Sequence, residues 1–529
     1  MLVTNTILAG ATSIIATVTP IDNGVIAADK TIIMTVLGTA SYSTNGAAYS
    51  ATNSLRNDDL TPLTTLFTDD FDLDHTANWA VKFSTNDVFT DFFFDYSTVA
   101  IPSAPHSTGS TTRGMKLKAH LGTYLSTLVG VSVSPLNVGF TGDYRLRFDM
   151  WYNFNGPLDA TGTGSTELLF AGVGAATSTT NGPFGLQARN NGGVYFAVSG
   201  DSGFGAGNTG SRDFGAYTNQ TALDSSAGNI DVWSAGTTTA ARDNSSPYYA
   251  EFGDLTAPPN QITLFPNQIR TNAPGGMGMC WHDVIITKTS TNVSWSIDGL
   301  LICTINTTAI NSALSTNIFF AYDDPFTGSL PDAPNAIFGL IDNVRVEQAS
   351  TNANLSSLVL TPGTLNPAFS SGIISYNATN AYLNNPVTVT ASTADANATM
   401  QLSFNGGAST PLTNAIASAA KTLNLNPPQN TLAVKVTAQD TNYVKTYTIN
   451  AKLQPSLTIP VLTNSYNGSS LAFSWAADHV GYRLLAQTNA LSVGLGSNWS
   501  PVPNSDTTNA VTIPVNPANP SVFYELIYP

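Results

Sequence analysis

Short runs of alternating apolar and polar residues recur along the whole chain. Each run is bounded by Asn-Gly, Asp-Gly, Pro-Gly, Gly-Gly or Asn-Pro pairs, which favour turns. The clearest runs are 13–18, 30–36, 144–151, 284–289, 293–298, 387–391, 432–438 and 511–515. A period of two predicts strands with one buried face, and evenly spaced short strands predict sandwiches or barrels. One helix-like stretch, 414–422, is too short to change an all-β class.

Polar or proline-containing stretches at 57–62, 347–354 and 453–455 interrupt this pattern. They divide the chain into four regions, which are 1–60, 64–348, 352–453 and 456–529. We therefore expect tandem β-sandwiches, with the second region as one large sandwich.

Composition and net charge limit the classes of partner that the chain can bind. Only 10% of the 529 residues are charged, and 19 Lys and Arg against 34 Asp and Glu give a net charge of −15. Helices need charged, straight-chain residues on their wet faces, so this deficit favours strands and turns. Without a basic cluster the chain has nothing to bind a phosphate backbone, and no apolar run reaches the ~18 residues of a membrane span. We expect neither nucleic acid binding nor membrane insertion.

The sequence says less about the cellular compartment of the protein. Residues 2–20 lack a basic n-region, since the first lysine is Lys30, so the chain carries no recognisable export signal. The two cysteines, Cys280 and Cys303, fit either a disulfide or two reduced thiols.

The first region contains two apolar runs joined by an acidic turn. Residues 16–37 read ATVTPIDNGVIAADKTIIMTVL, and Asn-Asp-Asp follows at 57–59. This order resembles the C-terminal half of a Calx-beta domain and implies a linking sandwich module. Asn23, Ala27 and Lys30 stand where calcium-binding members carry acids. Because the first strands of the module are missing, we expect either a fragment of a longer protein or completion by a strand of another chain.

The large region opens with LFTDDFD at 66–72 and closes with AIFGLIDNVRV at 336–346. Between them lie CWHDVII at 280–286 and VSWSIDGLL at 293–301, two strands separated by polar turns. This pattern resembles the concanavalin A-like, laminin-G-like jelly rolls. The resemblance implies a jelly roll whose first and last strands lie side by side.

The last two regions carry motifs of smaller modules. LSSLVLTPGTLNPAFS at 355–370 and NTLAVKVTAQD at 430–440 resemble the cadherin-like β-sandwich of bacterial surface proteins, which implies spacing and display. LAFSW at 471–475, GYRL at 481–484 and VFYEL at 522–526 resemble a fibronectin type III-like C-terminal module of secreted bacterial proteins.

The jelly-roll resemblance raises the question of glycoside hydrolysis, which needs two carboxyl groups across the scissile bond. The laminarinase-type Glu-x-Asp-x-x-Glu pattern is absent, because Glu167, Glu251 and Glu347 each lack a second Glu nearby. The acidic pairs at 69–74 and 323–324 are expected in solvated turns or as cation ligands. The five histidines are scattered, with His282 expected to face solvent or a loop. We predict no catalytic residue and a protein that is not an enzyme.

Two binding sites are predicted instead. Many jelly rolls of this kind hold a structural calcium where the first and last strands meet, which here points to Asp70, Asp72 and Asp342, with exposed strand-end acids as the alternative. A sugar needs an aromatic platform beside polar groups. The aromatic candidates are Trp151, Tyr152, Tyr217, Trp233, Tyr248 and Tyr249.

The sequence thus predicts an extracellular or cell-surface bacterial protein whose jelly roll binds a glycan or another surface ligand, with the other sandwiches as spacers. A structural subunit of a filament, joined to other copies of itself through an open strand edge in 1–60, is the alternative. A divergent glycoside hydrolase is a weaker one.

Overall fold

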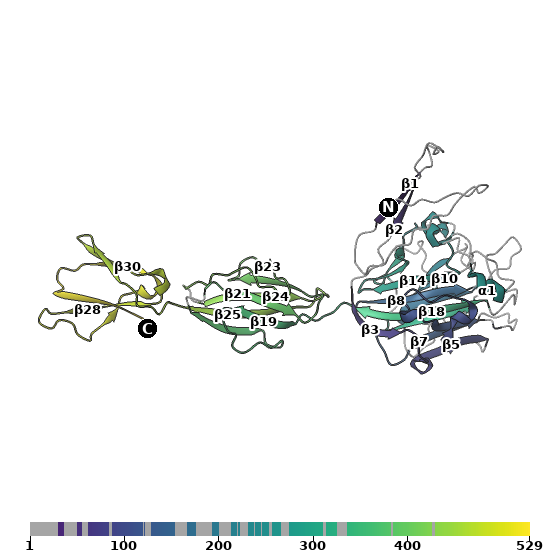
Figure 1. Cartoon of the computed structure of the whole chain (residues 1–529), viewed down its shortest axis with the longest axis horizontal. Helices are drawn as coiled ribbons and strands as arrows, with labels where there is room; N and C mark the ends of the chain where they lie inside the picture. The colour runs from purple at the N-terminus through teal and green to yellow at the C-terminus, as the bar shows by residue number, and fades with distance from the viewer. Residues whose placement is uncertain are drawn as a thin grey trace. The chain divides into compact units, whose positions relative to one another are not determined.

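The computed structural model describes the chain in segments. These are residues 30–35, 50–55, 62–83, 87–119, 121, 129–153, 167–175, 193–199, 213–218, 221–222, 231–236, 239–244, 246–252, 257–265, 275–309, 314–324, 336–381, 385–425 and 429–528. They divide into two compact units, Met1–Gln348 and Ala349–Pro529, drawn in Figure 1. Strands dominate both, which confirms the all-β class. The expected strand at 13–18 lies outside the described residues.

Two antiparallel sheets packed face to face form the jelly roll. The order in the seven-stranded sheet is β12 (Thr221–Ala222), β11 (Phe214–Thr218), β10 (Val194–Ser199), β9 (Leu168–Ala175), β17 (Asn317–Asp324), β7 (Val129–Pro135), β4 (Trp79–Phe83). The order in the nine-stranded sheet is β13 (Asp231–Trp233), β16 (Leu300–Asn306), β15 (Asn292–Ile297), β14 (Trp281–Lys288), β8 (Tyr144–Asn153), β18 (Phe338–Gln348), β6 (Arg113–Ala119), β5 (Val88–Asp95). Its ninth strand, β3 (Thr64–Asp69), also pairs with β18, so the first and last strands are neighbours as the resemblance implied.

Alternation along β8 separates the two faces of the nine-stranded sheet. Leu146, Phe148 and Met150 belong to the core between the sheets. Arg147 and Asp149 alternate with them and therefore lie on the outer face. One strand thus supplies both core packing and a polar outer surface.

The segment 96–112 covers part of that outer face. It contains the short 3-10 turns η2 (Tyr96–Val99) and η3 (Thr108–Ser110). Tyr96 and Ile101 pack there against Trp151, Phe338 and Leu340 in a second apolar cluster. The remaining short elements of the jelly roll are η1 (Thr76–Asn78), η5 (Thr239–Arg242), η6 (Pro247–Phe252) and α1 (Pro259–Leu264).

In the first region, β1 (Lys30–Thr35) and β2 (Ser50–Leu55) form a two-stranded antiparallel ribbon. Ile33 is 64% exposed and Met34 is 46% exposed. Because neighbouring strand residues point to opposite faces, both faces of the ribbon present an apolar side chain.

The second unit holds two smaller sandwiches. In the first, β19 (Leu355–Thr361) pairs with β21 (Thr388–Thr393), and the other sheet has the order β20 (Ser375–Ala381), β25 (Val444–Gln454), β24 (Gln429–Thr437), β22 (Thr399–Phe404), β23 (Thr410–Pro411). The stretch 414–422 is not helical there, and its Lys421 makes a β-bridge to Val387.

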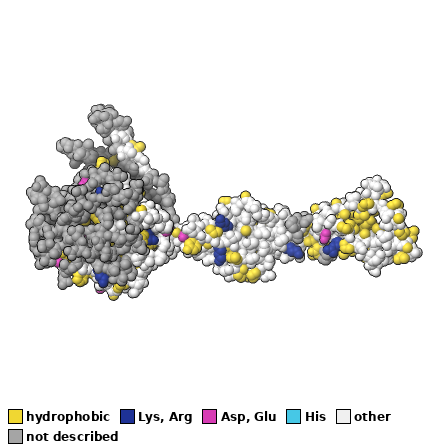
Figure 2. All heavy atoms as spheres, turned by 180° about the vertical axis from the view of Figure 1, so that it is seen from behind, with side chains coloured by type: hydrophobic (Ala, Val, Ile, Leu, Met, Phe, Trp, Pro, Cys, Tyr) yellow, Lys and Arg dark blue, Asp and Glu magenta, His cyan; other side chains and the backbone are white. Residues whose placement is uncertain are grey.

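The C-terminal module has two three-stranded sheets around a small core. They are ordered β26 (Thr463–Tyr466), β27 (Ser470–Ser474), β30 (Ala510–Pro514), and β29 (Ser500–Pro501), β28 (Arg483–Asn489), β31 (Ser521–Ile527), with η8 (Ala477–His479) and η9 (Ser505–Thr507) between strands. Phe473, Trp475 and Leu484 form its buried apolar cluster. Figure 2 shows apolar side chains gathered on one face of this module and few charged ones on the second unit.

Candidate functional site

The six aromatic candidates do not form an exposed platform. Trp151, Tyr152, Tyr217, Trp233 and Tyr249 are all at most 6% exposed, and Tyr248 is half-buried. They belong to three separate clusters: Trp151 beneath segment 96–112, Tyr217 stacked on Tyr195, and the other four in or against the main core. A sugar stacks on an exposed ring face, so we do not build the site on these residues.

The predicted calcium ligands differ in their surroundings. Asp70 is exposed and accepts the backbone N–H of Asp72 at 3.2 Å. Asp342 is buried, and its carboxyl group accepts Tyr96 Oη, Ser107 Oγ and the N–H of Asn343 at 3.0, 3.1 and 2.7 Å. These bonds already use both Asp342 oxygens, and a calcium ion at this point stays a prediction.

Two other acidic expectations need correction. Asp69 and Asp323 were expected in solvated turns or as cation ligands; they are only 4% and 3% exposed, so the first alternative is wrong for both. Asp69 accepts from the indole N–H of Trp79 at 2.8 Å and contacts His75 Nδ1 at 2.9 Å. Its carboxylate therefore fixes the start of the jelly roll, as buried carboxylates do when they are fully hydrogen-bonded.

A row of three carboxyl groups crosses the outer face of the nine-stranded sheet. Asp283 on β14 pairs with Asp149 on β8, which pairs with Asp342 on β18. Directly opposed side chains on neighbouring strands lie about 4.5–5.5 Å apart at Cβ. Asp149 is 0% exposed and Asp342 is 1% exposed, whereas the Asp283 side chain is 13% exposed. We call these three residues the acidic row.

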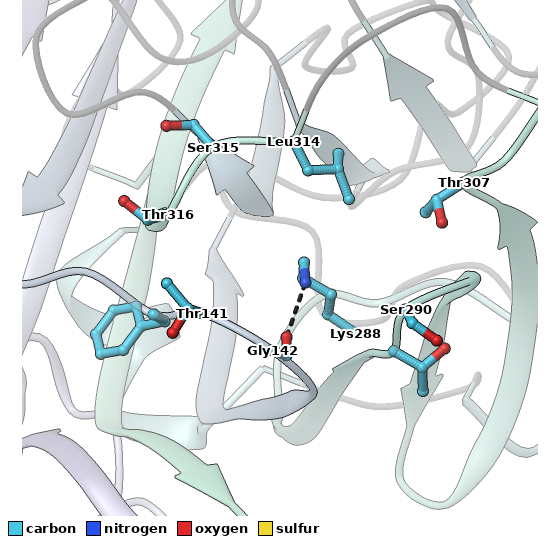
Figure 3. A pocket seen from close by; sticks show the side chains of 10 residues that line it. Thr141, Gly142, Lys288, Ser290, Thr307, Leu314, Ser315 and Thr316 are labelled. Atoms are coloured by element: carbon cyan, nitrogen blue, oxygen red, sulfur yellow. Dashed lines mark hydrogen bonds between the residues drawn. The ribbon is translucent and has the colours of Figure 1, made fainter.

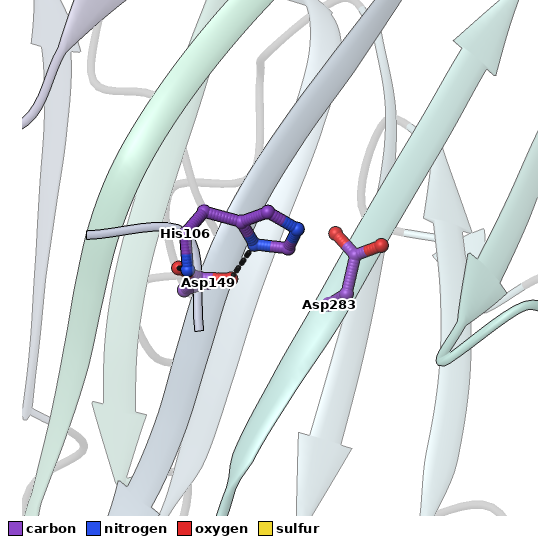
Figure 4. Close-up of side chains that lie close together, drawn as sticks. All are labelled: His106, Asp149 and Asp283. Atoms are coloured by element: carbon purple, nitrogen blue, oxygen red, sulfur yellow. Dashed lines mark hydrogen bonds and ion pairs between the residues drawn. The ribbon is translucent and has the colours of Figure 1, made fainter. Parts of the chain in front are cut away.

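His106, from segment 96–112, lies over the acidic row (Figure 4). Its Nδ1 contacts Asp149 Oδ1 at 2.6 Å, and its backbone N–H donates to Asp149 Oδ2 at 3.1 Å. The same Oδ2 accepts from the Asn343 amide at 2.8 Å. Because a carboxylate only accepts, the Nδ1 of His106 carries the proton and Nε2 is free to accept.

Arg147 closes this network from the sheet side. Its guanidinium donates to both oxygens of Asp283 at 2.8 and 2.9 Å, and its Nη2 lies 2.6 Å from His106 Nε2. His106, Asp149 and Asp283 place their ligand atoms within 4.8 Å of one another, a spacing that suits a metal ion. The cationic guanidinium already compensates that charge, so we assign no metal to the group.

Burial changes the acidity of the row. It raises the pKa of Asp342 to about 8 against three hydrogen bonds that lower it, and the charge of Asp149 adds to the increase. Burial also raises the pKa of Asp283, and the Arg147 bonds oppose that increase. The raised pKa favours the protonated form of Asp342 near neutral pH. Tyr96 Oη, which donates to Asp342 at 3.0 Å, also lies 3.2 Å from the carbonyl of Thr111.

A cavity of about 370 Å³ lies at the strand ends of the jelly roll (Figure 3). Its lining consists of Phe140, Thr141, Gly142, Lys288, Thr289, Ser290, Thr307, Leu314, Ser315 and Thr316. Six of these ten residues carry a hydroxyl group, and Lys288 carries the one charge. The ammonium of Lys288 donates to the carbonyl of Gly142 at 2.8 Å and lies 5.3 Å from the Tyr144 ring. We call this the hydroxyl pocket.

Sequence reasoning missed both the acidic row and the hydroxyl pocket. The paired residues of the row are 134 and 193 positions apart in the sequence, and only the strand register brings them together. The pocket joins four turns that each look like ordinary Thr- and Ser-rich connections. The alternation of Arg147, Asp149 and Trp151 on β8 was a usable signal, because it places charge on one face of a strand.

Fold and sites together define a class of protein: a multidomain all-β chain with a two-sheet jelly roll and smaller sandwiches. Within it, residues 355–453 match the family model of the cadherin-like beta sandwich domain, which confirms that part of the sequence prediction. No curated protein matches the chain in sequence. The Calx-beta and fibronectin type III resemblances stay predictions.

Solved structures with lectin-like folds resemble part of the chain. A galectin-like protein from Bacillus subtilis has 9% identity and a TM-score of 0.28, covering 54% of this chain and 96% of that one. The carbohydrate recognition domain of Emp46p, in a potassium-bound form, has 9% identity and a TM-score of 0.24, covering 54% and 94%. The VIP36 exoplasmic/lumenal domain, with Ca²⁺ and Man3GlcNAc bound, has 10% identity and a TM-score of 0.26, covering 51% and 86%. Likenesses of this size support no inference about ligand, metal or activity.

Proposed function

We propose that the protein is a non-enzymatic, extracellular or cell-surface glycan-binding protein, with the hydroxyl pocket of the jelly roll as its binding site. The observation that supports it is the lining of six hydroxyl-bearing residues around about 370 Å³ of space. A sugar offers a rim of hydroxyl groups that both donate and accept, and Ser and Thr side chains do the same. A pocket of this chemistry suits a polyhydroxyl ligand better than an apolar one.

The exposed hydroxyls of the pocket are available for such bonds. Thr141, Ser290 and Thr316 are exposed on three different connections. Thr289, by contrast, is used within its own turn, where its hydroxyl accepts the N–H of Asn292 at 3.0 Å. Lys288 adds one ammonium group, which favours sugars with an acidic substituent over neutral ones of the same shape.

The test is a double substitution that keeps shape and removes hydroxyls. Thr141→Val with Thr316→Val is expected to weaken binding to the glycans that wild type binds on an array by about tenfold, since each lost hydrogen bond contributes about 0.5–1.5 kcal/mol. Thr65→Val with Thr68→Val, two exposed threonines of β3 outside the pocket, is the matched control and is expected to bind like wild type. The proposal fails if wild type binds no glycan, or if both pairs bind equally.

The non-enzymatic part of the proposal is supported by burial of the acidic row. Two carboxyl groups of a glycosidase must reach the glycosidic oxygen and the anomeric carbon. Asp149 and Asp342 are enclosed beneath segment 96–112, where His106, Ser107 and Tyr96 bind their oxygens. Release of reducing sugar from polysaccharides by wild type, lost in Asp149→Asn and Asp342→Asn, would contradict it.

The interior of the cadherin-like sandwich is filled with apolar residues, which supports a spacer role. Surface location is checked by labelling intact source cells with an antibody against residues 355–453. No described helix is long and apolar enough to cross a membrane.

A second candidate function is a subunit that joins other copies of itself. It is favoured by the β1–β2 ribbon, whose described strands pair with one another and leave Ile33 and Met34 exposed on opposite faces. An isolated two-stranded ribbon is marginally stable in water and gains from an added strand. Light scattering is expected to show assemblies of wild type that dissociate in Ile33→Lys. A monomer at high concentration would contradict this candidate.

A further inference from the structure

Outside the pocket and the acidic row, three side chains form a hydrogen-bonded chain that ends on a thiol. Cys280 Sγ lies 3.1 Å from His282 Nε2, and His282 Nδ1 lies 2.7 Å from Asp298 Oδ2. A thiol, an imidazole and a carboxylate in this order are the parts of an activated cysteine, in which the base takes the thiol proton and the acid orients the base. Of the two surroundings expected for His282, solvent or a loop, the structure shows the second, because its side chain is 1% exposed and contacts Asp298 in the turn after β15.

Local structure holds the three groups in place. His282 points inward from β14, and the ring of Phe252 covers it edge-on with centroids 5.8 Å apart. Asp298 lies in the Asp-Gly turn between β15 and β16 with φ of 48°. Its other oxygen accepts the N–H of Asp283 at 2.8 Å, and its own N–H donates to the Asp283 carbonyl at 2.8 Å. These bonds tie the turn to the strand that carries the histidine.

The charges around His282 favour its protonated form. Burial alone lowers the pKa of His282, but the charges and hydrogen bonds of Cys280 and Asp298 outweigh burial and raise that pKa well above its usual value. Phe252, the third group against the ring, is uncharged. A protonated imidazole 3.1 Å from a cysteine sulfur is the arrangement found at nucleophilic cysteines.

The two cysteines differ in access. Cys280 is half-buried directly before β14, whereas Cys303 is 0% exposed within β16 and belongs to the main core. Neither forms a disulfide in the structure. A reagent in water therefore meets Cys280 and not Cys303.

We propose that Cys280 is a nucleophilic thiol activated by His282 and Asp298, and that it is a site of covalent modification by low-molecular-mass disulfides. The Cys280 sulfur attacks one sulfur of the disulfide, the Cys280–S bond forms and the original S–S bond breaks. The second sulfur leaves as a thiolate and takes the proton of the His282 imidazolium, which loses its partner charge when Cys280 becomes a disulfide. No oxidant beyond the small disulfide is needed.

The experiment follows mixed-disulfide formation by the native full chain with 2-hydroxyethyl disulfide, using intact mass and peptide mapping. One adduct on Cys280 is expected, and Cys280→Ala is expected to form none. At pH 6.5 the native rate is expected to exceed that of the same chain unfolded in guanidinium by about tenfold. The ratio should fall toward one near pH 9, where an ordinary thiol is also ionised.

Asp298→Asn tests the relay, since Asn tolerates the same left-handed turn and removes the charge. It is expected to slow the native reaction at pH 6.5 by about tenfold and to leave the reaction of the unfolded chain unchanged. If this variant does not fold, the native and unfolded wild-type rates still decide. A native rate at or below the unfolded rate from pH 6 to 8, an adduct on Cys303, or no adduct would overturn the proposal.

Discussion

The jelly roll and the cadherin-like sandwich are each built from two sheets, but they differ in the polar residues that they bury. In the described part of 355–453, the buried polar residues are two amides, Asn380 and Asn430. The described part of 64–348 instead buries acids, bases and a histidine. They are Asp69, Asp87, Lys116, Lys118, Asp149, Glu167, Asp213, Arg242, His282, Asp323, Asp342 and Glu347.

This difference fits the proposal that one domain is a spacer and the other carries binding sites. Removing an ionisable group from water costs free energy unless partners compensate it, so a domain that only keeps distance gains nothing from such groups. Perturbed ionisable groups cluster where chemistry or recognition occurs. The buried ionisable groups of the jelly roll therefore favour that domain as the one that carries the function. The cadherin-like sandwich, whose buried polar residues are amides alone among those described, fits a structural role.

The largest expected effect comes from removing the centre of the acidic row. Asp149→Ala leaves His106 and Asn343 without the acceptor of three hydrogen bonds at a site that is 0% exposed. We expect a loss of about 3–5 kcal/mol in the free energy of unfolding of the jelly roll. Urea unfolding followed by Trp fluorescence measures it, since five of the seven tryptophans lie in 64–348 and none in 355–453. A loss below about 1 kcal/mol would show that the row is not strongly coupled.

The next effect is a pH dependence confined to the jelly roll. Burial raises the pKa of Asp342 to about 8, so this group contributes stability that is full below its unfolded pKa and is lost as pH rises toward 8. The pKa values of Asp283 and His282 are also raised, and they act in the same direction. Between pH 5 and 7.5 we expect the jelly roll to lose stability on the order of a few kcal/mol.

Calorimetry of the full chain measures this slope. Asp342→Asn is expected to reduce the pH dependence of the jelly-roll transition. The transition of the cadherin-like sandwich, which contains no Trp, is expected to stay at the same temperature. Above pH 8 the slope should weaken, because burial lowers the pKa of Lys116 to about 8 and a base of that kind gains stability as pH rises. Equal slopes for both transitions would remove the contrast between the two domains.

The smallest effect probes the amide side of the comparison. Asn430 accepts the N–H of Asn424 at 2.7 Å and donates to its carbonyl at 2.9 Å. Asn430→Ala is expected to destabilise the cadherin-like sandwich by about 1–3 kcal/mol, less than the Asp149 substitution, because an amide is less costly to leave unpaired than a charge. Its effect should not change between pH 5 and 7.5. A pH-dependent effect would mean that a charged group contacts this amide.

The strands were predictable from sequence because strands with one buried face keep an alternation of apolar and polar residues. The runs at 144–151, 284–289 and 432–438 are β8, β14 and β24 within a few residues. The sites were not predictable for a related reason. Trp151 and Trp233 look like sugar-binding aromatics in sequence, yet segment 96–112 and the opposing sheet cover them.

The polar sites depend on register and on turn geometry, which one sequence does not encode locally. Asp149 and Asp342 become neighbours only when β8 and β18 pair. Among the polar sites that were not predicted, the Cys280–His282–Asp298 chain had the clearest signal in the sequence. Cys280 precedes His282 by two residues at the entry to β14, and the Asp-Gly turn that follows β15 brings Asp298 to the same histidine.

The position of β18 has a consequence for how this domain is made. β18 is the last strand of the jelly roll to be synthesised, yet it lies in the interior of the nine-stranded sheet, between β8 and β6, and also pairs with β3. A growing chain therefore exposes an unfilled slot in its main sheet until residue 348 has left the ribosome or the export channel. Truncation before residue 338 would remove a central strand of the sheet and not an edge strand. We therefore expect a chain truncated there to be unfolded.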